Sequence, residues 1–114
     1  MPPPEKLDVK WELSRVFRET WKNYKKAFPE ISKTMTEFDR CKRANPPERL
    51  PGKMKDHKLD GPLKGYMDCH LAADVILIYK VKPGGAIKLF LCCQHAELRP
   101  GPKAKALARR LSEL

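Results

Sequence analysis

A run of five apolar residues, Val75 to Tyr79, limits the architectures open to this chain of 114 residues. No apolar run is longer, so no segment approaches the ~20 residues that a membrane-spanning helix needs. Residues 1–6 also lack the apolar centre of a signal peptide, and we expect none. Continued to Val81, the run is apolar on both faces, which is typical of a strand buried in the centre of a sheet. The sequence therefore predicts one domain of modest size, built around this strand.

In the residues before this strand, the spacing of apolar side chains changes once, from that of a strand to that of a helix. Residues 9–13 alternate between apolar and polar side chains, which indicates a half-buried strand. Four aromatic residues then recur at helical spacing: Phe17, Trp21, Tyr24 and Phe28. Pro29 interrupts this face, and three apolar residues resume it: Ile31, Met35 and Phe38. We predict two helices, over residues 15–28 and 30–44, with the aromatic face in the core.

The rest of the chain predicts a loop, short strands and a final helix. Residues 45–63 are rich in proline and glycine, and a loop of this length is unusual in a compact domain unless it has a function. Alternation and apolar runs then predict three strands: 66–71, 75–81 and 87–93. Two turns join them: 72–73 and 82–86. Behind Pro100–Pro102, apolar residues at helical spacing predict a short amphipathic helix with a basic face.

This order of elements defines an α+β fold, with an N-terminal strand and two helices packed on an antiparallel sheet and a short extra C-terminal helix. Three parts of the chain are expected. Residues 1–8 form a disordered arm, residues 9–98 form the folded domain, and residues 99–114 form a basic helical extension.

The charge of the chain points to anionic partners. Lysine and arginine number 24 against 14 aspartates and glutamates, which gives a net charge of +10. Such a surface attracts polyanions, chiefly nucleic acid, the ribosome or an anionic membrane, and it fits an acidic protein partner equally well. The excess is spread over both halves of the chain, so it is not a basic tail on a neutral body. A soluble basic protein without a polyanionic partner has the same composition.

The four cysteines follow no secreted or zinc-binding pattern: Cys41, Cys69, Cys92 and Cys93. Two of them are adjacent within an apolar run, which indicates reduced thiols in the core of a cytosolic protein. No two cysteines are separated by two residues, so a structural zinc site has little support. A metal site made by His70, His95 and either Cys69 or Cys93 is an alternative.

All three histidines fall in the second half of the chain: His57, His70 and His95. A two-residue turn at 72–73 pairs His70 with Val75, and a turn at 82–86 pairs Val75 with Cys93. This register gathers His70, His95 and Asp74 at one end of the sheet, with both rings on one face. His57, in the long loop, can reach the same edge.

Two imidazoles at one site can act as base and acid on a single phosphodiester. One takes the proton of the ribose 2′-OH, and the other protonates the leaving 5′-oxygen. Nearby lysines hold phosphates, and a carboxylate orients an imidazole or raises its pKa. This chemistry needs no metal or other cofactor, so the pattern indicates a metal-independent ribonuclease.

Four stretches of the chain resemble the YafQ group of RelE-type toxins: Lys55–Gly61, Lys64–His70, Asp74–Lys80 and Gln94–Leu98. The family pattern runs K-D-H-x-L-x-G, then G-Y-R-(D/E)-x-H, then D-W-(I/L)-L-I-Y-K, and later a strand that ends in H-x-x-L. The resemblance covers roughly residues 11–98. It is most specific between residues 55 and 80.

The resemblance implies a toxin of a bacterial toxin–antitoxin pair, an endoribonuclease that cuts translated mRNA on the ribosome in the cytoplasm. It implies helices packed on a twisted antiparallel sheet, and a small antitoxin partner, often of the ribbon–helix–helix type. The family's catalytic positions match these residues: His57, His70, Asp74 and His95.

Three positions depart from the family pattern. Val75 replaces a tryptophan, Leu91 replaces an arginine, and Arg99 replaces an aromatic residue. The arginine would stabilise charge on the phosphate, and three residues are candidates to supply that charge instead: Lys55, Lys64 and Arg99. The alternative function is a non-catalytic RelE-like module that binds RNA, the ribosome or a protein partner.

Overall fold

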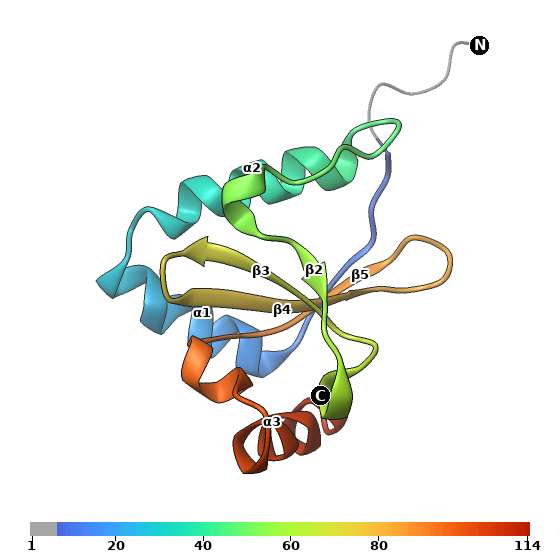
Figure 1. The fold of residues 1–114 in the computed structure, drawn as a ribbon. Helices are drawn as coiled ribbons and strands as arrows, with labels where there is room; N and C mark the ends of the chain where they lie inside the picture. The colour runs from blue at the N-terminus through green and yellow to red at the C-terminus, as the bar shows by residue number, and fades with distance from the viewer. Residues whose placement is uncertain (1–6) are drawn as a thin grey trace, which may run out of the picture.

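The structure is a computed structural model that describes residues 7–114, so most of the predicted arm, residues 1–6, lies outside the described residues. The described chain forms five strands and three α-helices (Figure 1). The strands are β1 (Trp11–Leu13), β2 (His57–Lys58), β3 (Met67–Ala72), β4 (Val75–Val81) and β5 (Ile87–Cys93). The helices are α1 (Arg15–Ala27), α2 (Ile31–Arg43) and α3 (Pro102–Ser112). Short 3₁₀ helices lie between them: η1 (Gly52–Met54), η2 (Gly61–Leu63) and η3 (His95–Leu98). None of the helices described is long and apolar enough to cross a membrane.

The strands form one sheet in the order β1-β5-β4-β3-β2. β4 lies at its centre, as the apolar run predicted. The sheet is mixed, which corrects the expected antiparallel arrangement, because β1 runs parallel to β5. The parallel pair is possible because the whole of the intervening chain separates the two strands and carries the second one back beside the first.

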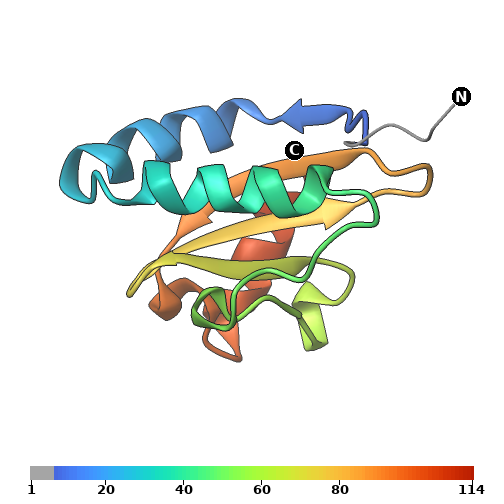
Figure 2. The ribbon, with the colours of Figure 1, turned by 90° about the horizontal axis from the view of Figure 1, so that it is seen from above.

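Both helices of the amino-terminal part form where the spacing predicted them. Ser14 caps α1, and its hydroxyl oxygen accepts a hydrogen bond from the amide of Phe17 at 2.9 Å. The same hydroxyl donates to the carbonyl of Phe90, which ties the start of α1 to β5. Pro29 lies in the short break between α1 and α2, and the two helices run side by side in opposite directions (Figure 2).

Two apolar clusters cover the two faces of the sheet. On the face of α1 and α2, buried residues of β4 are Val75, Leu77 and Tyr79. On the opposite face, Ile76 and Ile78 of the same strand pack with Leu107 and Leu111 of α3. The central strand is therefore buried on both sides, and the aromatic face of α1 packs against the first cluster as predicted.

The predicted register is correct at one end of the sheet and wrong at the other. Val81 pairs with Ile87 as expected, but a bulge at Phe90 makes Ile76, and not Val75, the partner of Cys93. The tight turn occupies residues 73–74 and not 72–73, and an irregularity after His70 pairs this histidine with Ile76. Each bulge inserts one residue into one strand, and alternation in the sequence does not reveal such an insertion.

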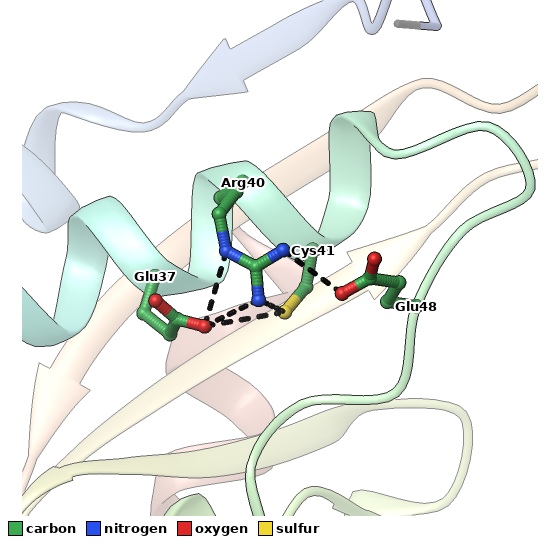
Figure 3. A network of polar contacts seen from close by, with 4 residues as sticks. All are labelled: Glu37, Arg40, Cys41 and Glu48. Atoms are coloured by element: carbon green, nitrogen blue, oxygen red, sulfur yellow. Dashed lines mark hydrogen bonds and ion pairs between the residues drawn. The ribbon is translucent and has the colours of Figure 1, made fainter. Parts of the chain in front are cut away.

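The long connection is more ordered than a loop. It contains η1 and η2, and between them β2 pairs His57 with Asp68 and Lys58 with Met67 of β3. Its start is held to α2 by the Arg40 guanidinium, which donates to Glu37 at 2.5 Å and to Glu48 at 2.9 Å (Figure 3). These groups are exposed, so the network orders the chain locally and adds little to stability.

Candidate active site

Asp74 and His95 form a closely bonded pair at one end of the sheet. Asp74 lies in the turn between β3 and β4, and His95 begins η3 directly after β5. Oδ1 of Asp74 accepts two hydrogen bonds from His95, one from the backbone N–H at 2.9 Å and one from Nδ1 at 2.7 Å. These bonds stabilise the carboxylate and lower the pKa of Asp74. Because Nδ1 carries the hydrogen that it donates to Asp74, Nε2 is the ring nitrogen of His95 that is left to exchange a proton with a substrate.

His70 meets His95 edge to face. Their ring centroids lie 4.7 Å apart with an angle of 76° between the planes. Partial burial lowers the pKa of His70, and the neighbouring charges of His95 and Lys55 lower it further. The lowered pKa favours the neutral imidazole of His70, which is the form that accepts a proton. The predicted meeting of His70, Asp74 and His95 is confirmed, although the register that led to it needed correction.

These two rings line a cleft of about 410 Å³ at this end of the sheet. The other side chains on its walls include Thr34 of α2 and the two lysines Lys53 and Lys55. The cleft therefore has two imidazoles on one side and ammonium groups on another, an arrangement that suits a phosphodiester.

His57 lies beside this cleft and not on its wall. Its Nδ1 lies 2.7 Å from the backbone carbonyl of Lys55 and 2.9 Å from Oδ1 of Asp68. A carbonyl oxygen can only accept, so Nδ1 carries the hydrogen and Nε2 is left to accept a proton. The Asp68 carboxylate acts on the ring by its charge.

Asp68 is the buried acid of the site, and sequence reasoning missed it. Its side chain is 2 % exposed, and burial raises the pKa of Asp68, although the neighbouring His57 opposes this shift. The signal in the sequence is position: Asp68 stands two residues before His70, so the two side chains belong to the same face of β3. Burial of an ionised carboxylate is unfavourable unless the group is paired, and His57 is the partner of Asp68.

Asp56 and Tyr79 hold the segment that carries Lys55 and His57. The buried hydroxyl of Tyr79 donates to Asp56, and burial raises the pKa of Tyr79. Lys42 of α2 lies with its Nζ 5.0 Å from the centre of the Tyr79 ring. No sequence pattern pointed to this contact, because Tyr79 belongs to the apolar run and its hydroxyl partner lies 23 residues away.

The three candidate phosphate-binding residues lie in different places. Lys55 lines the histidine cleft, whereas Lys64 lines a separate groove beyond β2. Arg99 follows η3 and is exposed. Leu91, at the position of the family arginine, is fully buried in the cluster that α3 covers, so an apolar side chain is the one that fits there.

The four cysteines are free and buried, as expected. Burial raises the pKa of Cys69, Cys92 and Cys93, so these thiols are neither nucleophiles nor ready metal ligands. Within residues 7–114, no three histidine, cysteine or acidic side chains are placed to hold a metal ion together.

The fold and the candidate site together indicate a class of protein. A small α+β domain with a histidine cleft at the end of its sheet is the architecture expected of RelE-type toxins. The family profile described as "Bacterial toxin of type II toxin-antitoxin system, YafQ" matches residues 9–100, and the chain belongs to this family.

Known proteins similar to this chain share both sequence and fold with it. The mRNA interferase toxin YafQ of Escherichia coli is 56% identical over 32 residues, which are 28% of this chain and 35% of that protein. The crystal structure of the E. coli DinJ-YafQ toxin-antitoxin complex matches 81% of this chain and 96% of its own, with 29% identity and a TM-score of 0.57. A copper-bound mutant toxin from Helicobacter pylori matches 79% and 98%, with 26% identity and a TM-score of 0.62. The sequence match thus spans about a third of the curated relative, and the structural match almost the whole of each solved chain.

Proposed function

We propose that this protein is the toxin of a toxin–antitoxin pair and cleaves mRNA by histidine acid–base chemistry without a metal. The observation that carries the proposal is the cleft in which a neutral His70 meets a His95 oriented by Asp74. The E. coli relative named an mRNA interferase toxin supports the substrate class. The family and the basic charge support action on ribosome-associated mRNA in the cytoplasm.

In this mechanism each imidazole has one task. His70 takes the proton of a ribose 2′-OH, and the 2′-oxygen attacks the adjacent phosphorus. The bond from phosphorus to the 5′-oxygen breaks, and Nε2 of His95 gives a proton to that oxygen. The products are a 2′,3′-cyclic phosphate and a 5′-hydroxyl end, so protons and electrons balance without another reactant. Asp74 holds His95 in position, and His57 with Asp68 borders the same edge as a second proton acceptor.

Lys55 is the residue that replaces the family arginine in this proposal. Its side chain lines the cleft with both histidines, and its positive charge contributes to the lowered pKa of His70. Lys64 and Arg99 do not line the cleft, so we assign them to binding of RNA outside the scissile phosphate. The cation stabilises the charge that develops on the phosphate oxygens in the transition state.

The partner proposed is a small antitoxin encoded beside the gene, possessing an acidic segment that meets the charge of +10. The DinJ-YafQ complex of E. coli supports such a pair. A ribbon–helix–helix antitoxin is the form that the family resemblance implies.

The test is cleavage by the purified protein of a defined mRNA, free and on programmed ribosomes, with the new 5′ ends mapped. His70→Ala, His95→Ala and Lys55→Met should each lower the rate by about 100-fold or more, whereas the exposed Lys26→Met should not. Because the pKa of His70 is lowered, the acid side of the pH–rate profile should have its midpoint below the ordinary value of 6.5. A midpoint above 6.5, or full activity of His95→Ala, would contradict the assigned roles.

A non-catalytic binding module is the second candidate, and the buried Leu91 favours it because the family arginine is lost. Under this alternative the wild-type protein binds mRNA or ribosomes but produces no new 5′ ends. Its His95→Ala variant then binds as well as the wild type.

A further inference from the structure

A second groove opens at the other end of β3 from the histidine cleft. Its volume is about 480 Å³, and its charged and aromatic walls are Lys58, Asp60, Lys64, Tyr66 and Lys80. None of the proposed catalytic side chains lines it. The groove is therefore separate from the proposed catalytic site.

Three separate segments bring their lysines to this groove. Lys58 comes from β2, Lys64 follows η2, and Lys80 lies near the end of β4. The lining of this single hollow thus contains three lysines and one acidic residue, Asp60. A hollow lined with this excess of positive charge attracts an anionic ligand.

The side chain of Lys80 contacts the loop that forms one wall of the groove. The Nζ atom of Lys80 lies 4.4 Å from the centre of the Tyr66 ring, which holds the ammonium group over the aromatic face. Gly65 has a φ of +100°, a conformation that favours glycine, and a Cβ at this position would be in ordinary van der Waals contact with the end of the Lys80 side chain, 3.9 Å from Nζ. The backbone amide of Leu59 donates to the carbonyl of Tyr66 at 2.9 Å and closes the loop around the groove. The ammonium group of Lys80 is consequently placed at the groove by its contact with Tyr66.

The groove and the histidine cleft lie along one edge of the molecule. β3 runs from Met67, which lines the groove, to Ala72, which lines the cleft, and this separation is about 17 Å. β2 lies along the same edge, with both His57 and Lys58 exposed. A strand of RNA that follows this edge would pass from one hollow to the other.

We propose that this groove is a second phosphate-binding subsite, which holds the single-stranded RNA several nucleotides away from the bond that is cut. The inference rests on the proposed function for its substrate class. It adds that Lys58, Lys64 and Lys80 bind the flanking backbone, so longer RNA gains affinity from the groove and very short RNA does not.

The test compares binding of RNA made uncleavable by 2′-O-methyl groups, as a trimer and as a 12-mer, over a series of KCl concentrations. The variant Lys58→Gln/Lys64→Gln/Lys80→Gln should lose most of the affinity that the 12-mer has over the trimer. The plot of log affinity against log salt for the 12-mer should become shallower by about 2 units, at ~0.7 per phosphate contact on a single strand. Affinity for the trimer should not change.

The matched control is Lys22→Gln/Lys25→Gln/Lys26→Gln, which removes the same charge from exposed positions of α1, the helix that packs against the other face of the sheet. It should leave the salt slope within a few tenths of the wild type. Equal effects of the two triple variants would overturn the proposal, because the groove would then act only through the net charge. Loss of trimer binding, or loss of binding to a polyglutamate peptide with unchanged RNA binding, would overturn it as well.

Because Lys80 contacts Tyr66, the double variant Lys58→Gln/Lys64→Gln provides a version that leaves this contact in place. Both of its positions are exposed, so its melting temperature should match that of the wild type while the salt slope falls by about 1.4 units. The readout is binding, so a protein that fails to cleave mRNA would refute the proposed function and leave this test unaffected.

Discussion

Lys55 connects the histidine cleft to His57 through its backbone. Its φ of 47° lies in the left-handed region, which a residue other than glycine seldom adopts. This conformation sends the carbonyl to Nδ1 of His57 while the side chain lines the cleft with His70 and His95. Backbone strain of this kind persists where the surrounding structure requires it, and it is found preferentially at functional sites.

At Asp68, function and stability make opposite demands. Its burial raises the pKa above the ordinary value of 3.8, so the folded protein binds more protons here than the unfolded chain. The stability that this group contributes is present below pH 3.8 and is lost as the pH rises through the folded pKa. Asp68→Asn should therefore raise the melting temperature at pH 7 by a few degrees, and the gain should vanish near pH 3. Cleavage by the same variant should fall about tenfold or more, because His57 loses its carboxylate.

The exposed Asp60→Asn serves as the control for this prediction, because it removes the same charge without a change in burial. Its melting temperature should stay close to that of the wild type at both pH values. Destabilisation by Asp68→Asn at pH 7 would mean that the ion pair with His57 outweighs the desolvation of the carboxylate.

Among the elements, α3 is the one that extends beyond the family match. The match ends at residue 100, and α3 follows it with Leu107 and Leu111 buried against the sheet. Its basic face points away, with Lys105, Arg109 and Arg110 exposed. The helix can therefore stabilise the fold through its buried face and bind RNA through its exposed face. Separate variants test these two roles. That residues 99–114 act as an extension of a domain at 9–98 stays a prediction.

Leu107→Ala should lower the free energy of unfolding by about 2–4 kcal/mol, since it leaves a cavity beneath α3. Chemical denaturation measures this loss. Neutralising the outward residues in Lys105→Gln/Arg109→Gln/Arg110→Gln should leave stability within about 0.5 kcal/mol, because surface substitutions seldom do more. A fall in RNA affinity in this triple variant would assign the helix a binding role in addition to its packing. An unchanged stability of Leu107→Ala would contradict the packing role.

The elements themselves were predictable from the sequence, and their pairing was only partly so. The aromatic residues at helical spacing predicted α1, and the apolar run predicted β4. Each prediction depends only on the pattern of side chains within the element itself. The bulge at Phe90 and the parallel pairing of β1 depend on contacts between distant segments. His70 and His95 still met as predicted, with their ring centroids 4.7 Å apart. The position of His57 on β2 was missed, since a strand of two residues has no period to detect.

For the whole molecule, the distribution of metal-binding side chains leads to a prediction about chelation. The four thiols are buried in the two core layers and their pKa values are raised, so they stay protonated at neutral pH. Nδ1 of His57 and Nδ1 of His95 are already engaged by a carbonyl and a carboxylate. Acid–base chemistry by imidazoles needs no ion, whereas a metal mechanism needs at least three ligands at one point.

Dialysis of the protein against EDTA, followed by removal of the chelator, should therefore leave its rate of cleavage of free RNA unchanged. Copper and zinc are the ions to add back, because imidazole ligands suit both. The chelator has to be removed before any assay on ribosomes, which need magnesium themselves. If activity disappeared after dialysis and one ion restored it, the histidines would have to act as ligands and not as acid and base. In that case His70→Ala and His95→Ala would lose metal binding together with activity, whereas under the proposed mechanism both variants lose activity alone.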